Sequence, residues 1–79
     1  MSLEKRLIME SLPLSQNGRS VSDLYEEVSD NFQLIRQRVL TKDDFLLALS
    51  ALDKEQSLVI LRGDDVRGTN HGFNKHGLL

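Results

Sequence analysis

The alternation of apolar and polar residues predicts four helices in the first two thirds of the chain. In each of them apolar residues recur every three or four positions, as on one face of an α-helix. The clearest stripe begins at Phe45 and continues with Ala48, Leu49 and Leu52, at spacings i, i+3, i+4 and i+7. The predicted helices cover 2 to about 12, 20 or 22 to about 28, about 32–39, and 41 to about 54.

Capping and turn residues set the ends of these predicted helices. Ser2 and Thr41 are suitable N-caps, and Pro13 ends the first helix because it disfavours helical backbone at the residue before it. Ser29-Asp30-Asn31 is interpreted as a break followed by a new cap. A short third helix then places Phe32, Ile35 and Val39 on its apolar face.

Short strands are predicted at two places, one early in the chain and one in its last third. Gly18 to Ser20 predicts a very short strand, and the apolar run Leu58–Leu61 predicts another, followed by a turn at 63–65 and a weak returning strand at 66–69. Residues 70–79 have no period, so we expect a loop or a loosely packed tail, anchored by Phe73. We therefore expect one domain over 1–69 and a flexible C-terminal tail over 70–79.

Composition narrows the class of protein. The chain has 79 residues, 39% of them hydrophobic, which suits one small core. Because cysteine is absent, disulfides and cysteine zinc sites are excluded, and we expect a cytoplasmic protein. The longest apolar run is only a few residues, so we expect no membrane span. The core is expected to contain several leucines, namely Leu3, Leu7, Leu24, Leu49, Leu52, Leu58 and Leu61.

Two segments give the sequence a resemblance to a known family. Asn17-Gly18-Arg19-Ser20-Val21-Ser22-Asp23-Leu24-Tyr25 resembles the approach to the second helix of winged helix-turn-helix domains. Residues 44–55, with their Ala-Leu-x-x-Leu pattern, resemble the family's recognition helix, and 58–61 resemble the strand that leads into its wing. The resemblance implies a mainly α fold with a small β-hairpin (α+β), with about four helices before a C-terminal wing. It also implies a small DNA-associated regulator.

Two features depart from the family pattern. Gln56-Ser57 occupies the stretch in which family members usually have glycine, between recognition helix and wing. The extra segment 31–40 lengthens the connection between the family's second and third helices.

The exposed face of the predicted recognition helix is a poor reader of DNA bases. Bases are read mainly by Arg, Lys, Asn and Gln, whereas this face offers one lysine, Lys54, together with the acid Asp43. Apolar residues on this helix favour a protein interface or contact with a second copy, with the alternative that the leucines fill the core beside the extra helix. The candidate interface residues are Leu46, Leu47 and Ala51.

Basic residues suggest a different mode of DNA association. Contacts to phosphates would give weak, salt-sensitive and mostly non-specific binding. The alternative is a solvated charged surface with no ligand. The candidate phosphate contacts are Arg36, Arg38, Lys42, Lys54, Arg62 and Arg67.

No motif predicts catalysis or a cofactor. His71 and His76 have two aspartates upstream, but zinc needs three or four convergent ligands, so no metal site is expected. Serines lie at caps and turns, and no small-molecule substrate is indicated. We expect a small non-enzymatic regulator that associates with DNA through phosphates; the alternative is a protein-interaction or homodimerisation module without DNA binding.

Overall fold

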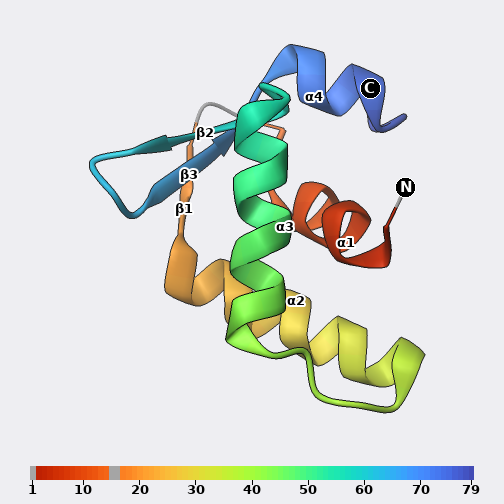
Figure 1. Ribbon diagram of the computed structural model, residues 1–79. Coiled ribbons are helices and arrows are strands. Elements are labelled where there is room, and N and C mark those ends of the chain that lie inside the picture. Colours follow the sequence, from red (N-terminus) through yellow and green to blue (C-terminus); the bar gives the residue numbers. More distant parts are fainter. Residues whose placement is uncertain (1, 15–16) are drawn as a thin grey trace.

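Four helices and three short strands make up the computed structural model, which describes residues 2–14 and 17–79 (Figure 1). Three helices precede a β-hairpin, and a fourth helix follows it. The elements in chain order are α1 (Leu3–Ser11), β1 (Arg19–Ser20), α2 (Val21–Arg36), α3 (Lys42–Lys54), β2 (Leu58–Leu61), β3 (Asp65–Gly68) and α4 (Asn70–Lys75).

The strands form one small antiparallel sheet in the order β1-β3-β2. The hairpin pairs Leu58 with Gly68 and Leu61 with Asp65, and β1 pairs Arg19 with Val66 on the other side of β3. The predicted short strand, hairpin and mainly helical α+β class are therefore confirmed. The four helices are distributed differently from the prediction, because only three of them precede the hairpin.

One apolar cluster joins the helices to the sheet. The cluster draws on α1, α2, α3, the hairpin and α4, and α1 packs against both α2 and α3. Its buried members are Leu7, Ile8, Met9, Leu12, Leu24, Val28, Phe32, Leu40, Phe45, Leu49, Leu52, Leu58, Val66 and Phe73. Five of the seven predicted core leucines belong to it, and Leu3 packs against it while partly buried.

The remaining core prediction, Leu61, is wrong. Side chains alternate between the two faces of a strand, so burial of Leu58 at 0% exposure places Val59 and Leu61 on the opposite face. Leu61 is 42% exposed there.

The predicted break at 29–31 is also wrong, because α2 runs without interruption from Val21 to Arg36. Leu24, Val28 and Phe32 lie four residues apart and are all buried, which maintains one apolar stripe through the polar triplet. The helix ends only where Gln37 adopts a left-handed conformation with φ of 58°.

Two of the three residues on the apolar face of the predicted third helix are not buried. Ile35 and Val39 are 56% and 63% exposed, because the end of α2 projects beyond the elements that cover its first turns (Figure 1). Leu40 is buried instead, and its carbonyl accepts a hydrogen bond of 2.8 Å from the Tyr25 hydroxyl.

The prediction of an aperiodic loop after the hairpin is wrong for Asn70–Lys75, which form α4. The hydroxyl of Thr69 caps this helix by accepting from the Gly72 N–H at 2.9 Å. Phe73 anchors it in the core as expected, with 3% exposure. Gly72 lies directly against the Ser57 backbone, where a Cβ atom would collide with the carbonyl. Six residues are too few to show a helical period in the sequence.

The unusual residue between α3 and β2 adopts a glycine-like conformation. Gln56 has φ of 62°, and its carbonyl accepts a 2.7 Å hydrogen bond from the Thr69 hydroxyl. A left-handed residue other than glycine costs about 1–2 kcal/mol. The position therefore has the backbone that glycine adopts freely, although the sequence has glutamine.

Replacing Gln56 with glycine should stabilise the fold. Relief of about 1–2 kcal/mol of strain, less about 0.5–1 kcal/mol for glycine's greater freedom when unfolded, leaves a net gain of about 0.5–1 kcal/mol. Urea denaturation measures this directly. As a control, Gln33→Gly within α2 should destabilise the chain, and a Gln56→Gly variant no more stable than wild type would contradict the strain argument.

Candidate functional site

A groove between α1 and α3 is the main concave feature beside the predicted recognition helix. It has a volume of about 410 Å³. Leu47 stands at its side with 69% of its surface exposed. The lining residues are Ser2, Glu4, Lys5, Asp44, Leu47, Ala48 and Ala51.

Two of the three predicted interface residues lie in this groove. Leu47 and Ala51 line it, whereas Leu46 does not and is 40% exposed elsewhere on α3. Successive helical residues differ by about 100°, which separates the two leucines. The alternative that they fill the core is wrong, because residues 31–36 belong to α2 and both leucines remain exposed.

The rim of the groove is acidic. Glu4 and Asp44 form no ion pair with any residue in 2–14 or 17–79. The one lysine of the rim, Lys5, lies 3.6 Å from a carboxylate oxygen of Glu55. The groove lining therefore combines the apolar residues Leu47, Ala48 and Ala51 with two carboxylates that have no ion pair among the described residues and lie in the first turns of α1 and α3.

Three exposed aliphatic side chains lie at the end of α2 and in the loop after it, with the successive residues Leu34 and Ile35 about 100° apart around the helix. Leu34, Ile35 and Val39 are 79%, 56% and 63% exposed. We call these three residues, together with Arg36, Arg38 and Lys42, the α2 corner. None of its three cations has an ion-pair partner among the described residues, and Arg38 lies over the Phe32 ring at 4.9 Å.

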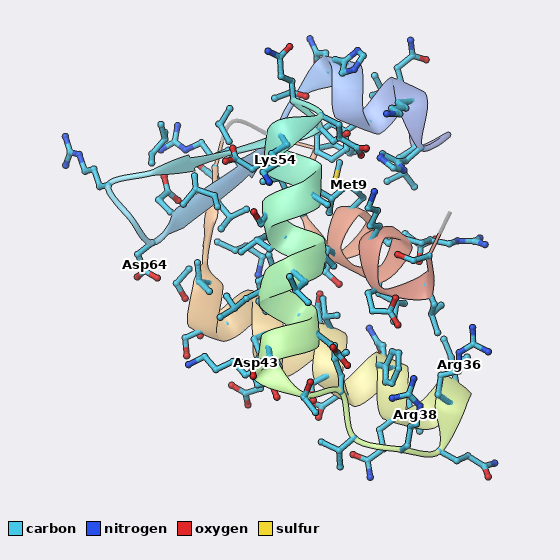
Figure 2. All side chains as sticks on the ribbon, in the orientation of Figure 1. Met9, Arg36, Arg38, Asp43, Lys54 and Asp64 are labelled. Atoms are coloured by element: carbon cyan, nitrogen blue, oxygen red, sulfur yellow. The ribbon has the colours of Figure 1, made fainter. Side chains whose placement is uncertain are left out.

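The predicted phosphate-binding residues do not form one surface. Figure 2 shows Arg36 and Arg38 at the end of α2, whereas Lys54 lies at the far end of α3. Arg62 belongs to the hairpin turn with φ of 53°, and Arg67 is paired with Asp65 at 2.8 Å. Arg36, Arg38 and Lys42 lie in one segment of the chain, Arg62 and Arg67 lie in the hairpin, and Lys54 lies apart from both groups.

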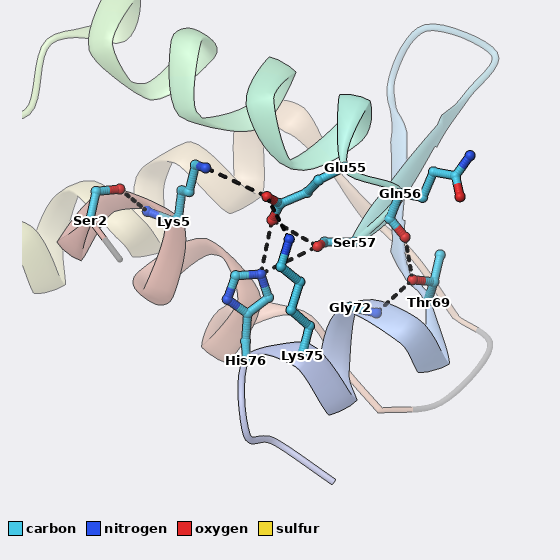
Figure 3. Close-up of polar contacts among 9 residues, drawn as sticks. All are labelled: Ser2, Lys5, Glu55, Gln56, Ser57, Thr69, Gly72, Lys75 and His76. Carbon is cyan, nitrogen blue, oxygen red and sulfur yellow. Dashed lines mark hydrogen bonds and ion pairs between the residues drawn. The ribbon is translucent and has the colours of Figure 1, made fainter.

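The strongest electrostatic cluster surrounds Glu55, at the end of α3 (Figure 3). Its carboxylate lies 3.2 Å from the Lys75 ammonium, 3.0 Å from His76 Nε2 and 3.6 Å from Lys5, and it accepts a 2.8 Å hydrogen bond from the Ser57 hydroxyl. The cluster joins α3 to both α1 and α4. Nothing local in the sequence indicated it, because its members are up to 71 positions apart.

This environment holds Glu55 in its charged form. Burial acts against the charge, but hydrogen bonds from Ser57, His76 and Lys75 and the charge of Lys5 outweigh it. Together they lower the pKa of Glu55 from 4.5 to about 2.

Glu55, Ser57 and His76 are residue types that also form hydrolase triads, but their geometry differs from a triad. In a triad one imidazole nitrogen contacts the nucleophile and the other contacts the acid. Here the same nitrogen, Nε2, lies 3.0 Å from Glu55 and 3.3 Å from the Ser57 hydroxyl. An ionised carboxylate only accepts hydrogen bonds, so Nε2 carries a proton and cannot take one from Ser57. Ser57 is also fully buried.

Other kinds of site find little support in the described part of the chain. No group of three or more His, Cys, Asp and Glu side chains there could hold a metal ion. His71 is exposed, whereas His76 belongs to the Glu55 cluster. None of the described helices has the length and apolar character needed to cross a membrane. Comparison with protein families, curated proteins and solved structures gave no match.

The Glu55 cluster predicts a specific loss of stability in acid. Because the pKa of Glu55 is lower in the folded state, its contribution is complete above about pH 4.5 and is lost as the pH falls toward 2. Urea denaturation between pH 7 and 2 should show Glu55→Gln to be less stable at pH 7 and less sensitive to acid. The control is Asp53→Asn, which removes a carboxylate that has no ion pair with a described residue. Its free energy of unfolding should fall in acid more nearly as that of wild type does than the free energy of Glu55→Gln. Parallel curves for Glu55→Gln and wild type would contradict this assignment.

Proposed function

We propose that the chain is a small winged-helix-type module that acts by binding another protein through α3 and the groove beside α1. The proposal is carried by one observation, the exposed Leu47 beside a groove floored by Ala48 and Ala51. An apolar surface next to a concavity is typical of protein interaction sites. The module is a regulator without catalytic activity, and the absence of cysteine favours the cytoplasm.

The order of elements supports the winged-helix part of this proposal. A helix, a short strand, two helices and a two-stranded hairpin follow one another, and β1 adds to the hairpin on the side of β3. In such an architecture α3 occupies the recognition position, and the hairpin is the wing. The accessible side chains of α3 include Asp43, Leu47 and Ser50, which suit contact with a protein better than contact with the edges of DNA bases.

A second candidate function is weak DNA association through phosphates. It is favoured by the five basic residues Arg36, Arg38, Lys42, Lys54 and Arg62, which form no ion pair within the described ranges. Their separation over α2, α3 and the hairpin favours non-specific contact over recognition of a sequence.

Leu47→Asp should abolish protein binding without unfolding the chain. Substitution of so exposed a side chain should change the free energy of unfolding by about 0.5 kcal/mol or less, whereas a carboxylate in an apolar contact strongly disfavours association. Sedimentation of the chain alone, and quantitative recovery of bound proteins on tagged chain, measure the effect. Leu46→Asp makes the same substitution on α3 outside the groove lining and should retain binding. Equal association of the two variants would contradict the proposal.

If the chain binds DNA through phosphates, the triple variant Arg36→Ala, Arg38→Ala and Arg62→Ala should bind DNA more weakly than wild type. Fluorescence anisotropy of a labelled duplex should show weaker binding and a slope of log affinity against log salt reduced by about 3, since each phosphate contact contributes roughly 0.9. Arg6→Ala, whose guanidinium pairs with Glu10, serves as the control. Undiminished binding by the triple variant would remove this mechanism.

A further inference from the structure

The α2 corner and the groove between α1 and α3 are complementary in form. Figure 1 shows the C-terminal end of α2 and the loop after it as a projecting corner of the molecule. The groove, in contrast, is a hollow between two helices. A projecting surface and a hollow one can pack together where two similar surfaces would leave a gap.

Their chemistry is complementary as well. The corner exposes Leu34, Ile35 and Val39, which match the apolar floor that Leu47, Ala48 and Ala51 give the groove. Contact between these surfaces would remove Leu34 and Leu47 from water. They are the most exposed aliphatic side chains of α2 and α3, at 79% and 69%.

Charge follows the same division. Arg36, Arg38 and Lys42 give the corner three positive charges beside the acid Asp30, while Glu4 and Asp44 give the groove two negative charges beside Lys5, which is paired with Glu55. The three corner cations, Glu4 and Asp44 form no ion pair with a residue that the structure describes. Complementary charges guide encounter and fix the register of an interface.

We propose that the partner of this module is a second copy of the same chain, with the α2 corner of each copy seated in the groove of the other. The inference rests on the proposed function, that α3 and its groove bind a protein. Each copy carries one corner and one groove, so a twofold arrangement satisfies all four surfaces and closes at two copies.

The size of the chain predicts a concentration-dependent dimer. A standard interface buries roughly 800 Å² per partner, whereas the whole chain exposes 5050 Å². Sedimentation equilibrium should therefore cover roughly 10 µM to 1 mM chain, a range that detects dissociation constants of ordinary transient dimers.

A charge exchange tests the proposal. One variant reverses the corner with Arg36→Glu and Lys42→Glu, and the other reverses the groove with Glu4→Lys and Asp44→Lys. Each variant alone brings like charges together and should be monomeric over the full range, while circular dichroism shows that it is folded. An equimolar mixture restores opposite charges at both contacts and should recover most of the wild-type dimer.

Matched controls change the net charge equally at other positions. Lys54→Glu with Arg62→Glu, and Asp23→Lys with Glu26→Lys, should dimerise as wild type does. A monomeric wild type at about 1 mM, dimers of both reversed variants, or a mixture that stays monomeric would overturn the second-copy proposal.

The two proposals fail in different ways. If Leu47→Asp dissociates the dimer but the charge exchange has no effect, α3 remains the binding surface and the corner is not its partner. If the dimer survives Leu47→Asp and the charge exchange alike, neither surface forms it and both proposals fail.

Discussion

Burial of one apolar cluster between α1, α2, α3 and the small sheet is the interaction on which the structure depends. The chain has 79 residues and therefore room for a single core, to which every helix contributes. A domain of this size buries a smaller fraction of its surface than a large one, so some aliphatic side chains stay outside. The exposed aliphatic residues of the α2 corner and Leu47 are consistent with this limit.

The Glu55 cluster adds polar contacts to α4, which makes few apolar contacts with the core. α4 is only six residues long and contributes one large buried side chain, Phe73. Ion pairs and hydrogen bonds from α1 and α4 to one carboxylate fix this short helix beside the end of α3. The same cluster places Lys5, which lines the groove, so stability and the form of the candidate binding surface are connected.

Local signals predicted much of the fold. The caps Ser2 and Thr41 and the apolar run at 58–61 identified α1, α3 and β2, because each signal lies within or next to one element. The continuity of α2 and the existence of α4 depend on tertiary packing of Phe32 and Phe73, which local propensity does not report. Of the candidate site, Leu47 and Ala51 were identified from helical periodicity, whereas the groove beside them requires α1 to be in place. The Glu55 cluster joins residues from both ends of the chain and had no local signal.

The central claim is that two copies meet through the α2 corner and the α1–α3 groove. The most direct measurement is an isotope-filtered NOE spectrum of a mixture of ¹³C-labelled and unlabelled chain, which detects only contacts between copies. The account predicts cross-peaks from the methyl groups of Leu34 and Val39 in one copy to those of Leu47 and Ala51 in the other. Contacts between copies that involve other surfaces, or no contacts in a concentrated sample, would contradict it.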